Sequence, residues 1–396
     1  MSAKIIKEKV QQAVNILKEL DIDLWLTFVR ESTTTIDPIL EIIAGANFTW
    51  HTALIICKDG DTAAVLGSME AEKLKGDVYK NIIGYLQSGK EPLVSYLKAK
   101  NPKKIALNYS KNSALADGLT QGLFLTLQDY LKGTGLEDRF VSAEEIISAL
   151  KGRKSETELS IMKDAITETE KIFDEVSKFI KPGKTELDIA EFIKKIVRDK
   201  GFELAWEEEH CPAVFTGPNT QGPHSGPTDR KVAKGHLVNI DFGIKYKGYC
   251  SDMQRTWYVL KDGEDKAPAE VQKGFNIIRD AIQKVADNLK PGVIGYEMDD
   301  IARNYIIEQG YDEYPHGLGH QVGRNVHDGG AGLLPKWERY GNTPYMKVEE
   351  GHVFTIEPRL KVEGYGTSTL EEEVLITKDG CRFLSNPEKE LILIKS

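Results

Sequence analysis

Two stretches in the second part of the chain follow the same order of landmarks, and this repeat constrains the fold more than any other feature. In each stretch an amphipathic helical pattern ends at Lys-Pro-Gly (181–183 and 290–292), and a second helical pattern ends at Gly201 or Gly310. The step from that lysine to that glycine is 20 residues in both copies (181 to 201, 290 to 310). Repeated landmarks at a fixed spacing indicate a duplicated structural unit.

Each copy then continues into a similar pair of strands. The segment 235–241 (Gly-His-Leu-Val-Asn-Ile-Asp) corresponds to 351–357 (Gly-His-Val-Phe-Thr-Ile-Glu), and each is followed by a returning strand that ends at Lys-Asp-Gly. The helical patterns have apolar residues at helix spacing, whereas these segments are short apolar runs that suit strands. We therefore predict a duplicated helix-helix-hairpin unit, with two copies around a pseudo-two-fold axis and their hairpins facing each other.

The first 150 or so residues lack this repeat and alternate between helix and strand patterns. A helix is expected at 4–20, and strands are expected at 23–29, 52–57, 62–66 and 105–109. Such alternation predicts a sheet covered by helices. The polar segment 151–156 marks a boundary, so we predict an α+β protein with a smaller α/β domain at 1–152 and a second domain at 153–396.

Composition excludes several classes of protein. Hydrophobic residues make up 40% and charged residues 29%, as in a folded globular chain, and the net charge of −9 disfavours a nucleic-acid partner. No stretch approaches the roughly 18 apolar residues of a membrane span, and the charged N-terminus does not resemble a signal peptide. The four cysteines are scattered, which suits a reducing compartment. We expect a soluble, cytoplasmic protein that binds neither nucleic acid nor membrane.

Four carboxylates occupy unusual positions in the repeated hairpins. Asp241 ends an apolar strand, where Asp is rare, and Asp252 lies on the returning strand. A turn centred on residues 246–247 would place these two aspartates opposite each other, and Glu357 and Glu371 repeat the arrangement. One such acid is normally a solvated strand end, but four at duplicated positions predict a compensating cation or a shared proton, because close like charges repel.

A glycine-rich segment supplies histidine. Three of the eight histidines lie in His316-Gly-Leu-Gly-His320-Gln-Val-Gly-Arg-Asn-Val-His327. Each glycine costs a helix about 1 kcal/mol, so we expect an irregular strand and loop whose backbone can approach a ligand closely. Carboxylates together with imidazole favour Mn²⁺, Fe²⁺, Co²⁺ or Zn²⁺. The alternative is a surface loop with incidental histidines.

These motifs resemble those of the pita-bread-fold metallopeptidases, which include methionine aminopeptidase, aminopeptidase P and prolidase. The resemblance covers residues 155–396 and rests on Ile-Asp241-Phe-Gly, Ser-Asp252-Met-Gln-Arg-Thr256, Gly-His320-Gln-Val-Gly, Ile-Glu357-Pro and Leu-Glu371-Glu. The two-domain layout resembles the prolidase and aminopeptidase P branch. It implies a pita-bread catalytic domain, hydrolysis of Xaa-Pro bonds in dipeptides or short peptides, and a homodimer.

The resemblance also implies the metal ligands. Asp241 would chelate one divalent ion, His320 and Glu357 would bind a second, and Asp252 and Glu371 would bridge the two. Mn²⁺ is the expected metal, with Co²⁺, Zn²⁺ and Fe²⁺ compatible.

The same resemblance assigns catalytic roles. Glu357 would be the general base that moves the proton of the attacking water toward the leaving amine. His224, His316 and His327 correspond to histidines that hold the substrate and stabilise the developing oxyanion.

Three lining positions depart from the family pattern, namely Gln321, Arg359 and Thr369. They leave the ligand set intact, so they bear on the substrate more than on metal binding. We hypothesise that Arg359 supplies the positive charge that the family often carries at position 369. Two alternatives remain: a small-molecule hydrolase or lyase on the same scaffold, creatinase-like or osmolyte-cleaving, and a binding protein with an inactive site, which the complete ligand set disfavours.

Overall fold

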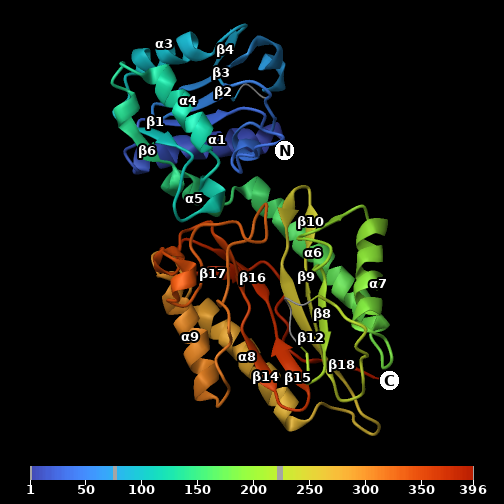
Figure 1. Cartoon of the computed structure of the whole chain (residues 1–396). Coiled ribbons are helices and arrows are strands. Elements are labelled where there is room, and N and C mark those ends of the chain that lie inside the picture. Colours follow the sequence, from blue (N-terminus) through green and yellow to red (C-terminus); the bar gives the residue numbers. More distant parts are fainter. Residues whose placement is uncertain (1, 75–77, 221–225, 396) are drawn as a thin grey trace. The chain divides into compact units, whose positions relative to one another are not determined.

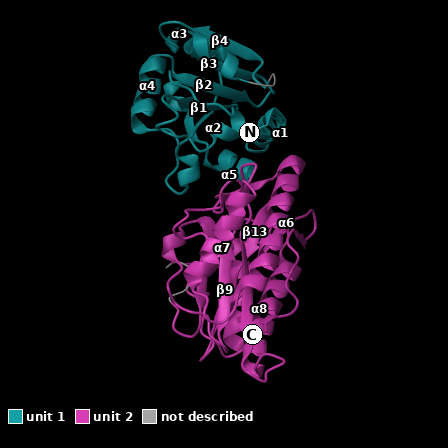
Figure 2. Cartoon of the chain, turned by 90° about the vertical axis from the view of Figure 1, so that its right-hand side faces the viewer, with its two compact units in different colours: residues 1–151 teal, residues 152–396 magenta. Residues whose placement is uncertain are grey.

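The computed structural model describes residues 2–74, 78–220 and 226–395. The chain divides into two compact units, residues 1–151 and 152–396 (Figure 2). Over the described residues, no helix has both the length and the apolar character needed to cross a membrane.

The first unit is built on a mixed six-stranded sheet with the order β4-β3-β2-β1-β5-β6 (Figure 1). Its strands are β1 (Leu24–Val29), β2 (Thr52–Cys57), β3 (Thr62–Gly67), β4 (Asn81–Tyr85), β5 (Ile105–Leu107) and β6 (Phe140–Ser142). β1 is central, and it pairs antiparallel with β2 and parallel with β5. The four strands expected from the sequence are confirmed, although β5 ends earlier than expected.

Helices cover both faces of this sheet. Residues of α1 (Ala3–Glu19), α2 (Leu40–Ile43) and α5 (Glu144–Gly152) join one core, and those of α3 (Lys90–Lys100) and α4 (Gln121–Leu131) join the other. Strand β1 contributes to both cores: Leu24 and Leu26 face one, and Trp25 and Val29 face the other. A strand buried on both faces is continuously apolar, which explains the run of residues in β1.

The first copy of the repeat opens the second unit. Its elements are α6 (Glu156–Phe179), α7 (Glu186–Asp199), β7 (Glu203–Leu204), β8 (Ala213–Thr216), β9 (Leu237–Phe242), β10 (Ile244–Tyr246), β11 (Tyr249–Cys250) and β12 (Met253–Val259). Capping boxes start both helices, with Ser155 and Thr185 as the N-caps. The apolar faces of α6 and α7 pack on β8, β9 and β12.

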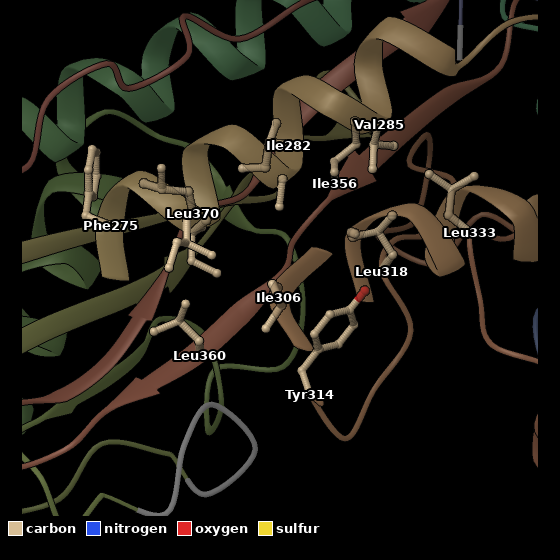
Figure 3. Close-up of a cluster of buried hydrophobic side chains, with 14 of the residues drawn as sticks. Phe275, Ile282, Val285, Ile306, Tyr314, Leu318, Leu333, Ile356, Leu360 and Leu370 are labelled. Atoms are coloured by element: carbon tan, nitrogen blue, oxygen red, sulfur yellow. The ribbon is translucent and has the colours of Figure 1, made fainter. Parts of the chain in front are cut away.

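The second copy repeats this plan. Its elements are α8 (Ala269–Asn288), α9 (Gly295–Glu308), β13 (Val353–Ile356), β14 (Arg359–Val362), β15 (Gly366–Thr369), β16 (Glu372–Ile376) and β17 (Cys381–Phe383). Phe275, Ile282 and Val285 of α8 pack with Ile356 and Leu370 (Figure 3). The last strand, β18 (Ile392–Ile394), returns to the first copy and pairs parallel with β12.

The predicted helix ends are confirmed at both Lys-Pro-Gly sequences. Gly183 and Gly292 have φ values of 90° and 93°, a backbone conformation that residues with a Cβ rarely adopt. The equivalent glycines that close the second helices, Gly201 and Gly310, also have positive φ. The repeated glycines therefore mark four points where the chain must turn out of a helix.

The two hairpins lie side by side within the second unit. Asn239 Nδ2 donates to the carbonyl of Thr367 (2.7 Å), and the N–H of Glu371 donates to the carbonyl of Gln254 (3.1 Å). These bonds join β9 and β12 of the first copy to β15 and to the residue that precedes β16 in the second. The acidic ends of both hairpins consequently meet in one place.

The predicted register of the first hairpin is wrong. Asp241 pairs with Gln254, and not with Asp252. The turn consists of Lys247 and Gly248, both at positive φ, as two-residue hairpin turns of type I′ require. The turn lies one residue later than predicted, which shifts the pairing by two residues.

The second hairpin keeps the predicted arrangement. Ile356 pairs with Glu372, and Arg359 pairs with Thr369, so one register continues across the break between these strands. Glu357 and Glu371 lie at facing positions in that break.

Candidate metal centre

Three side chains from separate elements form the centre of the site. Asp252, His320 and Glu371 each offer a ligand atom, and these atoms all lie within 4.8 Å of one another. Asp252 immediately precedes β12, Glu371 immediately precedes β16, and His320 lies in the irregular segment after α9. His320 Nε2 is 3.6 Å from Asp252 Oδ2. Two carboxylates and an imidazole at this spacing can hold a divalent cation.

Glu357 joins this group through His320. Its Oε1 lies 3.3 Å from His320 Nε2, and Gln254 Nε2 donates to its Oε2 at 3.3 Å. Burial alone would raise the pKa of Glu357, but the hydrogen bond and charge of His320, with the charges of His316 and His327, lower it overall. Glu357 is therefore the carboxylate in this group that most readily stays ionised.

The pKa values of the other three carboxyl groups are raised, whereas that of Glu357 is lowered. Burial, and then the charges of neighbouring carboxylates, raises the pKa values of Asp241, Asp252 and Glu371 well above their ordinary range. For Asp241 the neighbour is Glu357, and Asp241 in turn acts on Asp252 and Glu371. All four predicted carboxylates thus share one electrostatic environment.

Two oxygen atoms of this group are buried without a hydrogen-bond partner among the described residues. They are Asp241 Oδ1 and Glu371 Oε2. Buried polar atoms are nearly always paired, and close carboxylates repel unless a cation or proton lies between them. The donor set of four carboxylates and one imidazole therefore fits divalent metal, in the group of Mn²⁺, Fe²⁺, Co²⁺ and Zn²⁺.

Two glycines allow the chain segments that carry the ligands to approach closely. A Cβ at Gly319 would lie 2.0 Å from the carbonyl oxygen of Thr355. Because Gly319 has none, His320 can bond to β13 through its N–H (to Thr355 Oγ1, 3.1 Å) and its carbonyl (from the Thr355 N–H, 3.0 Å). Similarly, a Cβ at Gly243 would lie 1.9 Å from the Ser251 carbonyl oxygen beside Asp252. At both positions the close approach is between two backbone segments, and the predicted approach of the glycine-rich segment to a bound ligand stays a prediction.

The structure brings two of the three predicted substrate-facing histidines to the ligands. The ring of His327 meets that of His320 edge to face, with centroids 4.3 Å apart. His316 is partly buried, and its Nδ1 hydrogen-bonds the Gly317 carbonyl oxygen at 2.7 Å. Burial lowers the pKa of His316, although the charge of Glu357 opposes the shift. The third histidine, His224, lies outside the described residues.

The departures from the family pattern occupy different environments. Thr369 Oγ1 donates to Gln254 Oε1 at 2.8 Å, so Thr369 orients the amide that donates to Glu357. Arg359 lies directly across from Thr369 on the neighbouring strand. The side chain of Gln321 instead donates to the carbonyl of Ala331, at 3.1 Å.

Sequence reasoning did not single out Gln254 or assign a role to Glu373. Gln254 could have been found only from the correct hairpin register, which places it across from Asp241. Glu373 is fully buried, and its Oε1 accepts the backbone N–H of Asp252 at 2.9 Å. Burial raises the pKa of Glu373 to about 8. Through this bond Glu373 holds the backbone of Asp252.

Comparison with known proteins agrees with this geometry. Residues 160–378 match the family model of metallopeptidase family M24. A protein named only as an uncharacterized peptidase, from Staphylococcus aureus, is 31% identical over 339 residues, which are 85% of this chain and 88% of that protein.

Solved structures share the fold along nearly the whole chain. An Xaa-Pro dipeptidase from Bacillus anthracis has a TM-score of 0.73 at 23% identity and covers 98% of this chain and 100% of its own. A dipeptidase from Mycobacterium ulcerans has a TM-score of 0.74 at 22% identity, with 100% of both chains covered. A prolidase from Pyrococcus horikoshii has a TM-score of 0.67 at 26% identity and covers 97% of this chain and 100% of its own.

The duplicated unit and its shared acidic site define a pita-bread fold with an additional N-terminal domain, as predicted. The chain belongs to metallopeptidase family M24, whose members use divalent metal ions.

Proposed function

We propose that this protein is an Xaa-Pro exopeptidase, a dipeptidase or aminopeptidase P-like enzyme that uses two divalent metal ions, preferably Mn²⁺. The observation that carries the proposal is the convergence of Asp252, His320, Glu357 and Glu371 in a chain of family M24. The named activities of similar structures, an Xaa-Pro dipeptidase and a prolidase, support the substrate class.

In this proposal the ions are held by the predicted ligands Asp241, Asp252, His320, Glu357 and Glu371. Bound divalent ions polarise a scissile carbonyl and make water nucleophilic at neutral pH. The Glu357 carboxylate, kept ionised by its histidine neighbours, accepts a proton from the attacking water and delivers it to the leaving amine. Gln254 fixes the orientation of Glu357 by donating to its Oε2.

The histidines hold the substrate. Because Nδ1 of His316 is engaged by the Gly317 carbonyl, the neutral ring presents Nε2 as an acceptor for a substrate N–H. In this proposal His327, whose ring lies against that of His320, donates to the developing oxyanion. His224 is assigned to the same substrate-binding group on the family resemblance.

The first test is hydrolysis of Xaa-Pro dipeptides and tripeptides by protein that has been stripped of metal and reloaded with Mn²⁺, Co²⁺ or Zn²⁺. We expect proline release that depends on added metal and is lost in Asp252→Asn. Asp174→Asn, at an exposed position of α6, is the matched control and should retain activity. Tight metal binding without turnover of any peptide would contradict the peptidase proposal, and turnover of creatine or a zwitterionic osmolyte would replace it with the small-molecule alternative.

A second prediction concerns Arg359. Its guanidinium is half-buried near Glu357 and His316, and among the described residues it has no hydrogen-bond or ion-pair partner. If it supplies the positive charge of the site, Arg359→Ala should lower kcat/KM by roughly 10- to 100-fold, the value of a hydrogen bond to a charged group. Lys361→Ala, on the same strand but exposed, is the control. Unchanged activity and metal affinity in Arg359→Ala would refute the assigned role.

A further inference from the structure

Residues 314–320, called here the His316 segment, carry two site histidines without being a helix or a named strand. Its apolar side chains anchor it to the second unit: Tyr314 and Leu318 are buried in the same cluster as Ile306 of α9 (Figure 3). Such packing restrains the segment but does not fix the orientation of each peptide group. Polar contacts to the backbone must do that.

A buried ion pair on α9 makes those contacts. Arg303 Nε lies 2.7 Å from Asp299 Oδ2, and Arg303 Nη2 lies 2.9 Å from Asp299 Oδ1. The two residues are one helical turn apart, and their exposed fractions are 0% for Asp299 and 6% for Arg303. The bidentate geometry leaves three of the five guanidinium N–H groups for other acceptors.

All three remaining donors have acceptors, and two of these acceptors are carbonyls of the His316 segment. Arg303 Nη1 donates to the Tyr314 carbonyl and Nη2 donates to the His316 carbonyl, both at 2.7 Å. Nη1 also donates to Glu313 Oε2 at 3.2 Å. The carboxylate of the ion pair also bonds the His316 segment, because Asp299 Oδ1 accepts the N–H of Leu318 at 3.0 Å.

Aromatic rings hold the plane of this guanidinium. It lies 4.2 Å from the ring centroid of Tyr314 and 5.0 Å from that of Trp337. A planar fork that is fixed by a bidentate carboxylate and by rings cannot be replaced by the point charge of lysine, which has three donors and no plane.

The Asp299–Arg303 ion pair acts on the imidazole of His316 through one peptide group. Arg303 holds the carbonyl of His316, and the next carbonyl, that of Gly317, bonds Nδ1 of the same ring. A Cβ at Gly317 would lie 2.1 Å from Leu334 Cδ2, so a larger residue there would require the Leu334 side chain to move. The direction of Nε2 therefore depends on a backbone that Arg303 and Asp299 orient.

We propose that Asp299 and Arg303 are positioning residues that aim His316 at the substrate, an inference that rests on the proposed function. A buried ion pair is not an economical way to gain stability, since apolar residues of similar volume often serve as well. Here its donors and acceptors are directed to the backbone on both sides of one site histidine, which gives the pair a geometric role.

A double-mutant cycle tests this role with the metal-loaded full chain and an Xaa-Pro dipeptide. Arg303→Lys should lower kcat/KM by about 10- to 100-fold, as a misplacement on the order of 1 Å does. In a His316→Ala background the same substitution should have little further effect on kcat/KM, because the group that it positions is gone. Arg279→Lys, at a partly exposed arginine of α8, is the matched control and should leave kcat/KM unchanged in both backgrounds.

The thermal midpoint and the metal content of each variant separate positioning from folding. Arg303→Lys should lower the midpoint equally in both backgrounds, while its effect on kcat/KM appears in only one. Equal effects on kcat/KM in both backgrounds would overturn the inference. If His316→Ala itself keeps full activity, His316 does not hold the substrate, and the positioning role of Arg303 is refuted with it. Should Arg303→Lys not fold, Asp299→Asn, which preserves shape, replaces it in the same cycle.

Discussion

Glu357→Gln should reduce kcat by about 10³-fold or more, measured with saturating metal and an Xaa-Pro dipeptide. The amide keeps the size of the side chain, so the hydrophobic core beside Ile356 stays intact. It removes the proposed base, because an amide nitrogen cannot accept the proton of water, and it removes a proposed charged ligand next to His320. The loss should therefore appear in kcat even where metal is bound, and it should be constant at pH values well above the lowered pKa of Glu357, where the wild-type carboxylate is ionised.

Glu373→Gln is the matched control for that experiment. Glu373 is more deeply buried than Glu357, is also close to Asp252, and lies two residues from Glu371 in the same hairpin. A glutamine there still presents an oxygen to the N–H of Asp252, and the raised pKa of Glu373, about 8, shows that burial already favours the uncharged side chain. Most activity should remain. An equal loss in both variants would mean that any change of charge in this hairpin is disruptive, and Glu357 would lose its special role.

The repeated part of the fold could be predicted from sequence because its signals are local. Apolar spacing, the Lys-Pro-Gly turns and the closing glycines each report on residues within one helix, and α6, α7, α8 and α9 match the expected helices. Duplication then supplied the long-range information, since a site that appears twice must lie near the axis that relates the copies. This is why Asp252, Glu357 and Glu371 could be expected to meet.

The remaining features of the site depend on contacts that no local pattern encodes. The first hairpin turns at Lys247-Gly248, and Lys247 has a positive φ although lysine is not a residue type that favours this conformation. The pairing of Asp241 with Gln254 follows from the position of that turn. Likewise, Asp299 and Arg303 look like an ordinary surface pair at i and i+4 of a helix. Only the fold shows that both are buried and bonded to the His316 segment.

Removal of metal should destabilise the second unit, and the effect should grow as the pH rises. In the metal-free chain, burial and mutual repulsion raise the pKa values of Asp241, Asp252 and Glu371 above those of the unfolded chain. The folded state then binds more protons than the unfolded state above the ordinary carboxyl pKa of about 4, so its stability falls as the pH increases through the raised values. Metal ligands must be deprotonated, so metal binding strengthens in the same direction.

The gap between the thermal midpoints of metal-loaded and metal-free protein should therefore widen between about pH 6 and about pH 8. With metal at 100 times its Kd, each site contributes about 2.7 kcal/mol, or roughly 5–10 °C for a unit of this size. Glu371→Gln provides the decisive comparison, because it removes one of the repelling charges and one proposed ligand together. Without metal it should melt higher than the wild type near pH 8, yet it should gain less from added Mn²⁺. Glu363→Gln, at a highly exposed position, should change neither the thermal midpoint without metal nor the gain from added Mn²⁺. A metal-free wild type that is as stable at pH 8 as at pH 6 would show that these carboxylates do not repel one another, and the argument for a cation between them would fail.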